Sequence, residues 1–157
     1  MPMGGSGASE RDPDWRNYPD TVLWFQSAPP LRVDLRSALS ERERRAFADM
    51  GLHGTFAVIT AFDPLGHDLP RDENMMRAES LERRLTATRE VFVRVDACSP
   101  DRSHCEASLA WKTGLQEASR LARELEQIGF FWFDAEIFWI IAAAAGTDPI
   151  ALPRTGA

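Results

Sequence analysis

Residues 90–112 read EVFVRVDACSPDRSHCEASLAWK, and this stretch decides the class of fold. Apolar and polar side chains alternate over 90–98, where Val91, Val93 and Val95 share one parity, as in a β-strand with two different faces. A polar turn follows, and alternation returns over 106–112. The stretch therefore predicts a β-hairpin of two antiparallel strands.

The segments after residue 54 alternate between strand and helix patterns. Residues 55–62 are apolar at both parities, which is typical of a central strand covered on both sides. The helix that follows has Ala78, Leu81 and Leu85 as its buried stripe. The expected elements from there on are a helix at 71–86, strands at 90–98 and 106–112, a helix after Thr113, and strands at 128–133 and 137–143. This order predicts an α+β protein with a ferredoxin-like β-α-β-β-α-β core, extended by a C-terminal hairpin strand.

The ends of the chain lie outside this core. Residues 21–27 have the pattern of a strand, and Ser40 with Glu43 forms a capping box that begins a helix. We expect this N-terminal strand and helix to pack on the sheet. The expected regions are a disordered leader at 1–14, a single α/β domain at 15–145 and an extended tail at 146–157.

Charge and composition argue against several classes of function. The 24 acidic and 18 basic residues give a net charge of −6, which does not suit nucleic-acid binding. No apolar run approaches the ~20 residues that cross a bilayer, and the N-terminus lacks a secretory signal. Lysine occurs once, at Lys112, and the bias toward arginine is typical of a GC-rich bacterial genome. We therefore expect a bacterial, cytoplasmic protein that binds neither nucleic acid nor a membrane.

The two cysteines, Cys98 and Cys105, lie at the ends of the predicted hairpin turn. Cys98 shares parity with the polar Asp96, whereas Cys105 shares parity with the apolar Leu109. If the polar and apolar parities face opposite sides, the two sulfurs point apart. The pattern therefore predicts reduced thiols with neither a disulfide nor a metal between them, and we expect no cofactor.

Polar residues gather where the strand at 55–62 meets the following helix. Asn74 falls on the centre of the helix's buried stripe and Arg77 about 60° from it. They either line a pocket near the strand's end or fasten the preceding loop. Asp63, His67 and Asp68 in that loop would suit a cation, but their spacing matches no metal motif, so we expect no metal site.

Glu106 and Ser108 lie at the polar parity of the returning strand. We expect them beside Arg94 and Asp96 of the neighbouring strand. One interpretation is a solvated face of cross-strand ion pairs. The other is a groove under the N-terminal segment, in which Glu106 is an acid/base or a ligand anchor.

Aromatic residues crowd the last hairpin, and they allow two interpretations. Phe131, Trp132 and Trp139 form an interface for a homodimer or protein partner, or they are buried under the N-terminal helix.

Four short motifs along the chain can be compared with known families as a set. They are Thr60-Ala61-Phe62-Asp63-Pro64, Glu73-Asn74 with Arg77, Glu106-Ala107-Ser108, and Gln127 ahead of the aromatic strand. This set resembles a bacterial family of unknown function with a T-A-x-N-P signature, then E-N-x-x-R, E-x-S and Q-x-x-x-F. The chain departs from it at Asp63, where asparagine is usual, and at Pro70, where a serine is common. The resemblance implies no activity, but it nominates one polar set: Thr60, Asp63, Asn74, Arg77, Glu106, Ser108 and Gln127.

Three functions are compatible with these residues. The hydrogen-bonding character of the polar set favours a non-catalytic module that binds a small ligand, such as a nucleotide or amino acid. The alternatives are an interaction module that uses the aromatic hairpin and an enzyme that uses Glu106 or Asp63 as acid/base.

Overall fold

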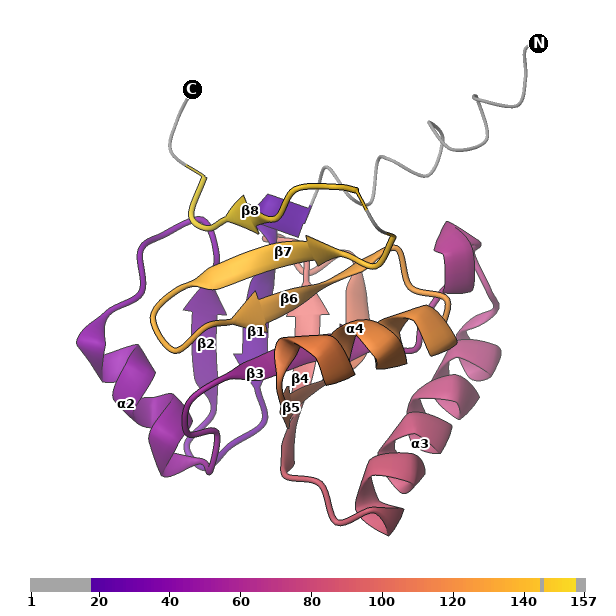
Figure 1. The fold of residues 1–157 in the computed structure, drawn as a ribbon, viewed down its shortest axis with the longest axis horizontal. Helices are drawn as coiled ribbons and strands as arrows, with labels where there is room; N and C mark the ends of the chain where they lie inside the picture. The colour runs from indigo at the N-terminus through magenta and orange to yellow at the C-terminus, as the bar shows by residue number, and fades with distance from the viewer. Residues whose placement is uncertain (1–17, 145, 155–157) are drawn as a thin grey trace, which may run out of the picture.

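Eight antiparallel strands form one curled sheet in the computed structural model, which describes residues 18–144 and 146–154 (Figure 1). The strand order is β2-β1-β4-β5-β3-β6-β7-β8. The strands are β1 Val22–Phe25, β2 Leu31–Asp34, β3 Phe56–Thr60, β4 Phe92–Cys98, β5 Cys105–Lys112, β6 Gly129–Phe133, β7 Phe138–Ala142 and β8 Ile150–Ala151. The described helices are α2 Glu41–Asp49, α3 Arg71–Ala87 and α4 Leu115–Glu124, with 3-10 turns η1 Tyr18–Asp20 and η2 Pro64–Gly66. The expectation of an α+β protein is confirmed.

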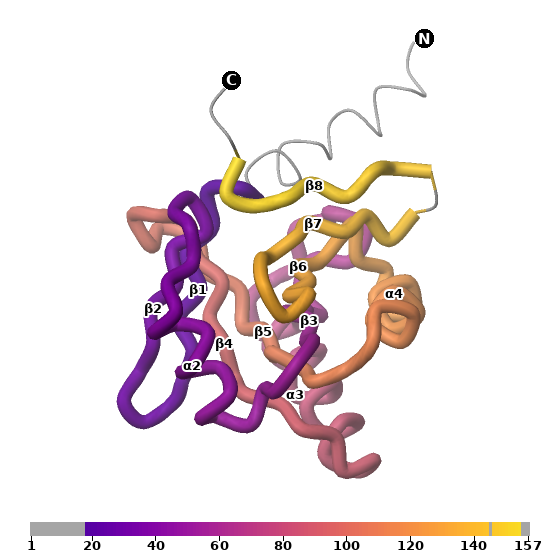
Figure 2. Tube along the Cα trace, turned by 60° about the vertical axis from the view of Figure 1, so that its left-hand side comes forward, coloured from indigo at the N-terminus to yellow at the C-terminus, as the bar shows by residue number. Residues whose placement is uncertain are grey.

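The helices cover opposite faces of the sheet (Figure 2). Helix α2 packs on the face that we call inner, where its Phe47 contacts Phe25 of β1 and Phe138 of β7 at centroid distances of 5.3 and 5.9 Å. Because these strands lie near opposite ends of the strand order, the sheet must curl around α2. Helices α3 and α4 cover the outer face, where Leu81 and Leu121 belong to a second core.

The N-terminal strand lies in the sheet rather than over it. Strand β1 pairs with β4 along four residues, and β2, which the sequence pattern does not predict, pairs with β1. The capping box at Ser40 and Glu43 is present, as predicted. Part of the expected extended tail forms β8 beside β7. The expected leader at 1–14 lies outside the described residues.

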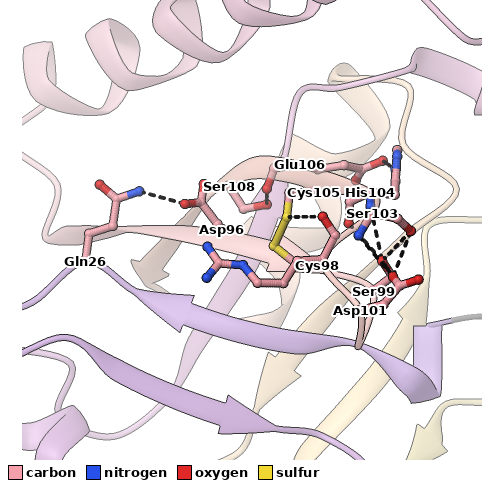
Figure 3. The surroundings of a disulfide bond; sticks show 11 residues. Gln26, Asp96, Cys98, Ser99, Asp101, Ser103, His104, Cys105, Glu106 and Ser108 are labelled. Atoms are coloured by element: carbon pink, nitrogen blue, oxygen red, sulfur yellow. Dashed lines mark hydrogen bonds and ion pairs between the residues drawn. A yellow bond between two sulfur atoms is a disulfide. The ribbon is translucent and has the colours of Figure 1, made fainter.

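The register of the β4–β5 hairpin corrects two predictions. Cys98 is the direct partner of Cys105, and the two form a disulfide with Cα atoms 4.1 Å apart (Figure 3). Partners in an antiparallel pair project to the same face, so the expected separation of the sulfurs is wrong. Arg94 likewise lies opposite Leu109 rather than beside Ser108.

Both errors have one cause. Alternation reports which residues of one strand share a face, but it carries no information on which face of the next strand they join. Matching the strands by polarity placed Arg94 and Asp96 with Glu106 and Ser108, whereas the register places Asp96 opposite Ala107. Disulfides are rare in cytosolic proteins, so this bond does not support the expected cytoplasmic location, which stays a prediction. None of the described helices is long and apolar enough to cross a membrane.

Candidate functional site

A pocket of about 750 Å³ opens on the inner face of the sheet. Its floor includes Val58 and Thr60 of β3, Ser108 of β5 and Phe131 of β6. The η1 turn contributes Tyr18 and Asp20, and the turn between β4 and β5 forms part of the rim. The pocket thus joins segments from the beginning, middle and end of the fold.

The sequence of each floor strand explains why the core stops here. Along the inner face, β3 presents Phe56, Val58 and then Thr60, and the antiparallel β6 presents Phe133 beside Phe56, Phe131 beside Val58, and Gly129 at its own start. On β5 the apolar Ala110 gives way to Ser108 and then Glu106. The large apolar side chains end together, and Gly129 has no side chain to fill the space. A polar cavity therefore continues the inner core.

The ionisable groups that line the pocket are mostly acidic. Asp20, Asp68, Asp101 and Glu106 contribute carboxylates, and His104 contributes an imidazole. None of the described lining residues is lysine or arginine. The pocket therefore favours a cationic ligand group over an anionic one.

Asp101 organises the turn that forms the rim (Figure 3). Its Oδ1 accepts hydrogen bonds from the backbone N–H of Ser103 at 3.0 Å and from the hydroxyls of Ser103 and Ser99 at 2.7 and 2.9 Å. The Ser103 backbone bond, followed by the hydroxyl bonds, lowers the pKa of Asp101 to about 2. The carboxylate thus remains charged at neutral pH.

Asp63 occupies an unusual backbone conformation just beyond β3. Its φ of 48° and ψ of 64° are left-handed, a region that Asp tolerates better than most residues. The amide of Asn74 holds it there, because Asn74 Oδ1 accepts from the Asp63 N–H at 2.9 Å and Nδ2 donates to Asp63 Oδ1 at 2.8 Å. The Leu69 N–H donates to the same carboxylate oxygen at 3.0 Å. Asn74 is only 4% exposed, so it supports the loop from the buried side.

Asp63 meets two residues of the hairpin. One donor atom from each of Asp63, His104 and Glu106 lies within 4.8 Å of the other two. His104 Nε2 and Glu106 Oε2 are 3.3 Å apart, and Figure 3 shows the two side chains side by side. An imidazole and two carboxylates are donor types that bind first-row divalent metals.

Arg77 and Gln127 are engaged with backbone carbonyls. Arg77 donates from Nε to Ala61 O at 2.6 Å and from a terminal nitrogen to Leu125 O at 3.0 Å. Gln127 Nε2 donates to Phe62 O at 2.9 Å. These bonds fasten the end of β3 to the connection between α4 and β6.

The structure divides the sequence-predicted polar set into two groups. Thr60, Glu106 and Ser108 line the pocket, and Asp63 meets Glu106 at its edge. The other group does not line the pocket but forms hydrogen bonds with residues 61–63 at the start of the loop after β3: Asn74, Arg77 and Gln127. The hydroxyl of Thr60 donates to Ala107 O at 2.8 Å and that of Ser108 to Glu106 O at 3.1 Å, so both hydroxyls also bind the sheet backbone.

The sequence reasoning missed His104 as a member of the site. The signal was present, since His104 shares its parity with Glu106 and Ser108 and precedes them on the same strand side. His104 can be assigned to the site only together with Asp63, which comes from a loop 41 positions earlier in the chain. Only the pairing of β3 with β5 brings that loop to the hairpin.

The aromatic hairpin contributes mainly to the interior. Phe131 and Trp132 are 6% and 7% exposed and belong to the inner and outer cores respectively. Trp139 is half-buried against the outer core, and its indole N–H donates to Asp134 at 2.8 Å. The single chain thus buries most of this aromatic surface by itself.

Comparison with known proteins adds a family for part of the chain. Residues 59–128 match the family described as Protein of unknown function (DUF3293). This segment begins in β3, ends just before β6, and contains Thr60, Asp63, Asn74, His104 and Glu106. No curated protein and no solved structure gives a significant match. The match supports the expected family of unknown function, while the detailed signature and a bacterial origin stay predictions.

Proposed function

We propose that the protein binds a small molecule that carries a positively charged amine, with the amine facing the carboxylates of the inner-face pocket. The observation that carries this proposal is the lining of the pocket, where four carboxylates accompany one imidazole. An apolar or aromatic body would lie against Val58 and Phe131. Of the two ligand classes that the sequence suggests, an amino acid, through its ammonium group, suits this lining better than a nucleotide, whose phosphates would meet negative charge.

The connectivity supports a second proposal, that β3, α3, β4, β5, α4 and β6 form a ferredoxin-like unit. Strand β5 lies between β3 and β4, and β3 lies between β5 and β6. Each helix thus connects two strands with a third between them, which is the split β-α-β arrangement of that fold. In this unit the pocket lies on the face away from both helices.

A charge series with a constant body tests the binding proposal. Tyramine, 4-ethylphenol and 3-(4-hydroxyphenyl)propionate share a phenol ring and differ chiefly in their charge. Two-dimensional NMR titration at pH 7 should give the tightest binding for tyramine and the weakest for the carboxylate, with shifts at Thr60 and Phe131. Equal or tighter binding of the carboxylate would overturn the proposal.

Two double variants test whether the carboxylates of the pocket are the ones that attract the amine. Asp20→Asn with Asp68→Asn removes two lining carboxylates and should weaken tyramine binding about 2- to 30-fold, since exposed charge pairs contribute about 0.2–1 kcal/mol each. Asp49→Asn with Asp148→Asn changes the net charge equally at exposed positions outside the pocket lining. The control pair should retain the wild-type affinity. An equal loss in both pairs would mean that the net charge of the protein, rather than the pocket, attracts the amine.

A further inference from the structure

The rim of the pocket holds three side chains whose chemistry goes beyond amine binding. Asp63 follows β3, whereas His104 and Glu106 belong to the end of the β4–β5 hairpin. Their donor atoms converge within 4.8 Å although the loop and hairpin are far apart in sequence. Two carboxylates alone would be ordinary on an acidic surface, but the imidazole makes this a mixed nitrogen and oxygen donor set.

The spacing of the donors suits a small metal ion. Two ligands at about 2.1 Å from a tetrahedral ion lie about 3.4 Å apart. His104 Nε2 and Glu106 Oε2 are 3.3 Å apart without any rearrangement. The remaining donor, from Asp63, lies within 4.8 Å of both.

The protein already orients the carboxylate of Asp63. The bonds from Asn74 Nδ2 and the Leu69 N–H both go to Oδ1. Ligation through Oδ2 would leave both of these bonds intact. Hydrogen bonds that fix a carboxylate from behind are a regular feature of metal sites.

The surroundings leave room for further ligands. Glu106 and His104 both line the 750 Å³ pocket, so one side of the cluster faces open space. Three protein ligands with vacant positions are the arrangement of metal sites that also bind an external molecule. Mg²⁺ and Ca²⁺ prefer oxygen donors throughout, whereas the imidazole favours first-row transition metals.

We propose that Asp63, His104 and Glu106 bind one divalent first-row transition metal ion, such as Zn²⁺ or Co²⁺, at the rim of the pocket. Asn74 is a positioning residue that holds Asp63. The ion would present its open coordination positions to whatever occupies the pocket. This site does not require that the pocket's own ligand be an amine.

Titration with Co²⁺ tests the site, because bound Co²⁺ reports its coordination through visible absorption. Full-length oxidised protein, freed of metal with EDTA, should bind one equivalent, and Zn²⁺ should displace it, whereas Mg²⁺ should not. Asp63→Asn, His104→Ala and Glu106→Gln should each weaken binding more than about 100-fold, and Asn74→Ala about 10–100-fold. His53→Ala removes another exposed histidine and should bind as the wild type does.

The controls separate this proposal from its rivals. The side chain of His104 is 65% exposed, so His104→Ala should fold normally, which circular dichroism can verify. Cys98→Ser with Cys105→Ser should keep Co²⁺ binding, which excludes adventitious thiol ligation. Asp20→Asn with Asp68→Asn should weaken tyramine but leave Co²⁺ unaffected, so either proposal can fail alone. Absence of stoichiometric Co²⁺ binding, or equal binding in the folded His104→Ala variant, would overturn the metal site and leave the His104–Glu106 contact as a simple hydrogen bond.

Discussion

Replacing Asn74 should destabilise the loop between β3 and α3 by an amount that the structure defines. The buried amide donates to the Asp63 carboxylate at 2.8 Å and accepts from the Asp63 N–H at 2.9 Å. A hydrogen bond to a charged group contributes about 1.5–3 kcal/mol and a neutral one about 1 kcal/mol. Asn74→Ala should therefore cost about 3 kcal/mol, which lowers the Tm of a chain of this size by about 6–12 °C.

Asn74→Asp gives a sharper version of the same prediction. It keeps an acceptor for the Asp63 N–H but places a second carboxylate against the first, and the nearby like charge raises the pKa of the introduced carboxyl. The penalty is therefore full only above the raised pKa of the folded carboxyl, and it decreases as the pH falls toward the unfolded pKa, when the protonated group can donate to Asp63 as the amide did. Asn74→Ala has no group that could recover in this way.

Urea denaturation at pH 7 and pH 4.5 measures both effects. At pH 7 the free energy of unfolding of Asn74→Asp should be no higher than that of Asn74→Ala. At pH 4.5 the difference between the two variants should shift in favour of Asn74→Asp. Glu73→Ala, at an exposed neighbour in the same turn, should stay within about 0.5 kcal/mol of the wild type. A cost below about 1 kcal/mol for Asn74→Ala, or no pH dependence of the difference between the two variants, would refute the role of this amide.

Two further predictions concern the hairpin and the sheet edge. Reduction of the Cys98–Cys105 disulfide, which closes a loop with a sequence separation of 7, should cost about 2.5 kcal/mol by loss of the loop constraint. Calorimetry should show a lower Tm with a reductant for the wild type but no change for the double Ser variant, and an unchanged wild-type Tm would contradict this. The side-chain hydrogen bond from Arg36 holds the pKa of Asp34 at about 2, so this bond stabilises the fold above pH ~4 and is lost as the pH falls toward 2. Asp34→Asn should cost about 1 kcal/mol at pH 7 and little at pH 2 in urea titrations, whereas parallel stability curves for variant and wild type would argue against it.

Local patterns in the sequence predicted much of the fold. The alternation over 90–112 predicted the β4–β5 hairpin, and the leucine stripe of α3 indicated which side packs on the sheet. Leu81 and Leu85 are indeed 3% and 2% exposed. The capping box at Ser40 predicted where α2 begins. Each of these signals depends on residues within a few positions of one another, where backbone geometry decides which side chains meet.

Short strands escaped the sequence pattern for a physical reason. Strand β8 has two residues, Ile150 and Ala151, and β2 has four. Two residues have no periodicity of their own, and the extended conformation of both strands is stabilised by hydrogen bonds to β7 and β1. They become strands because the neighbouring edges are available, which is a property of the assembled sheet.

The candidate site shows the same division between local and non-local information. The sequence by itself determined which residue types are present, that Asn74 faces the core, and that Glu106 and Ser108 share one side of a strand. Only the tertiary structure decided that Cys98 faces Cys105 and that Asp63 reaches His104. Register and strand order are set by the packing of whole faces against the two cores. A one-residue shift of one strand would move all its side chains to the other face, and nothing within a single strand records that choice.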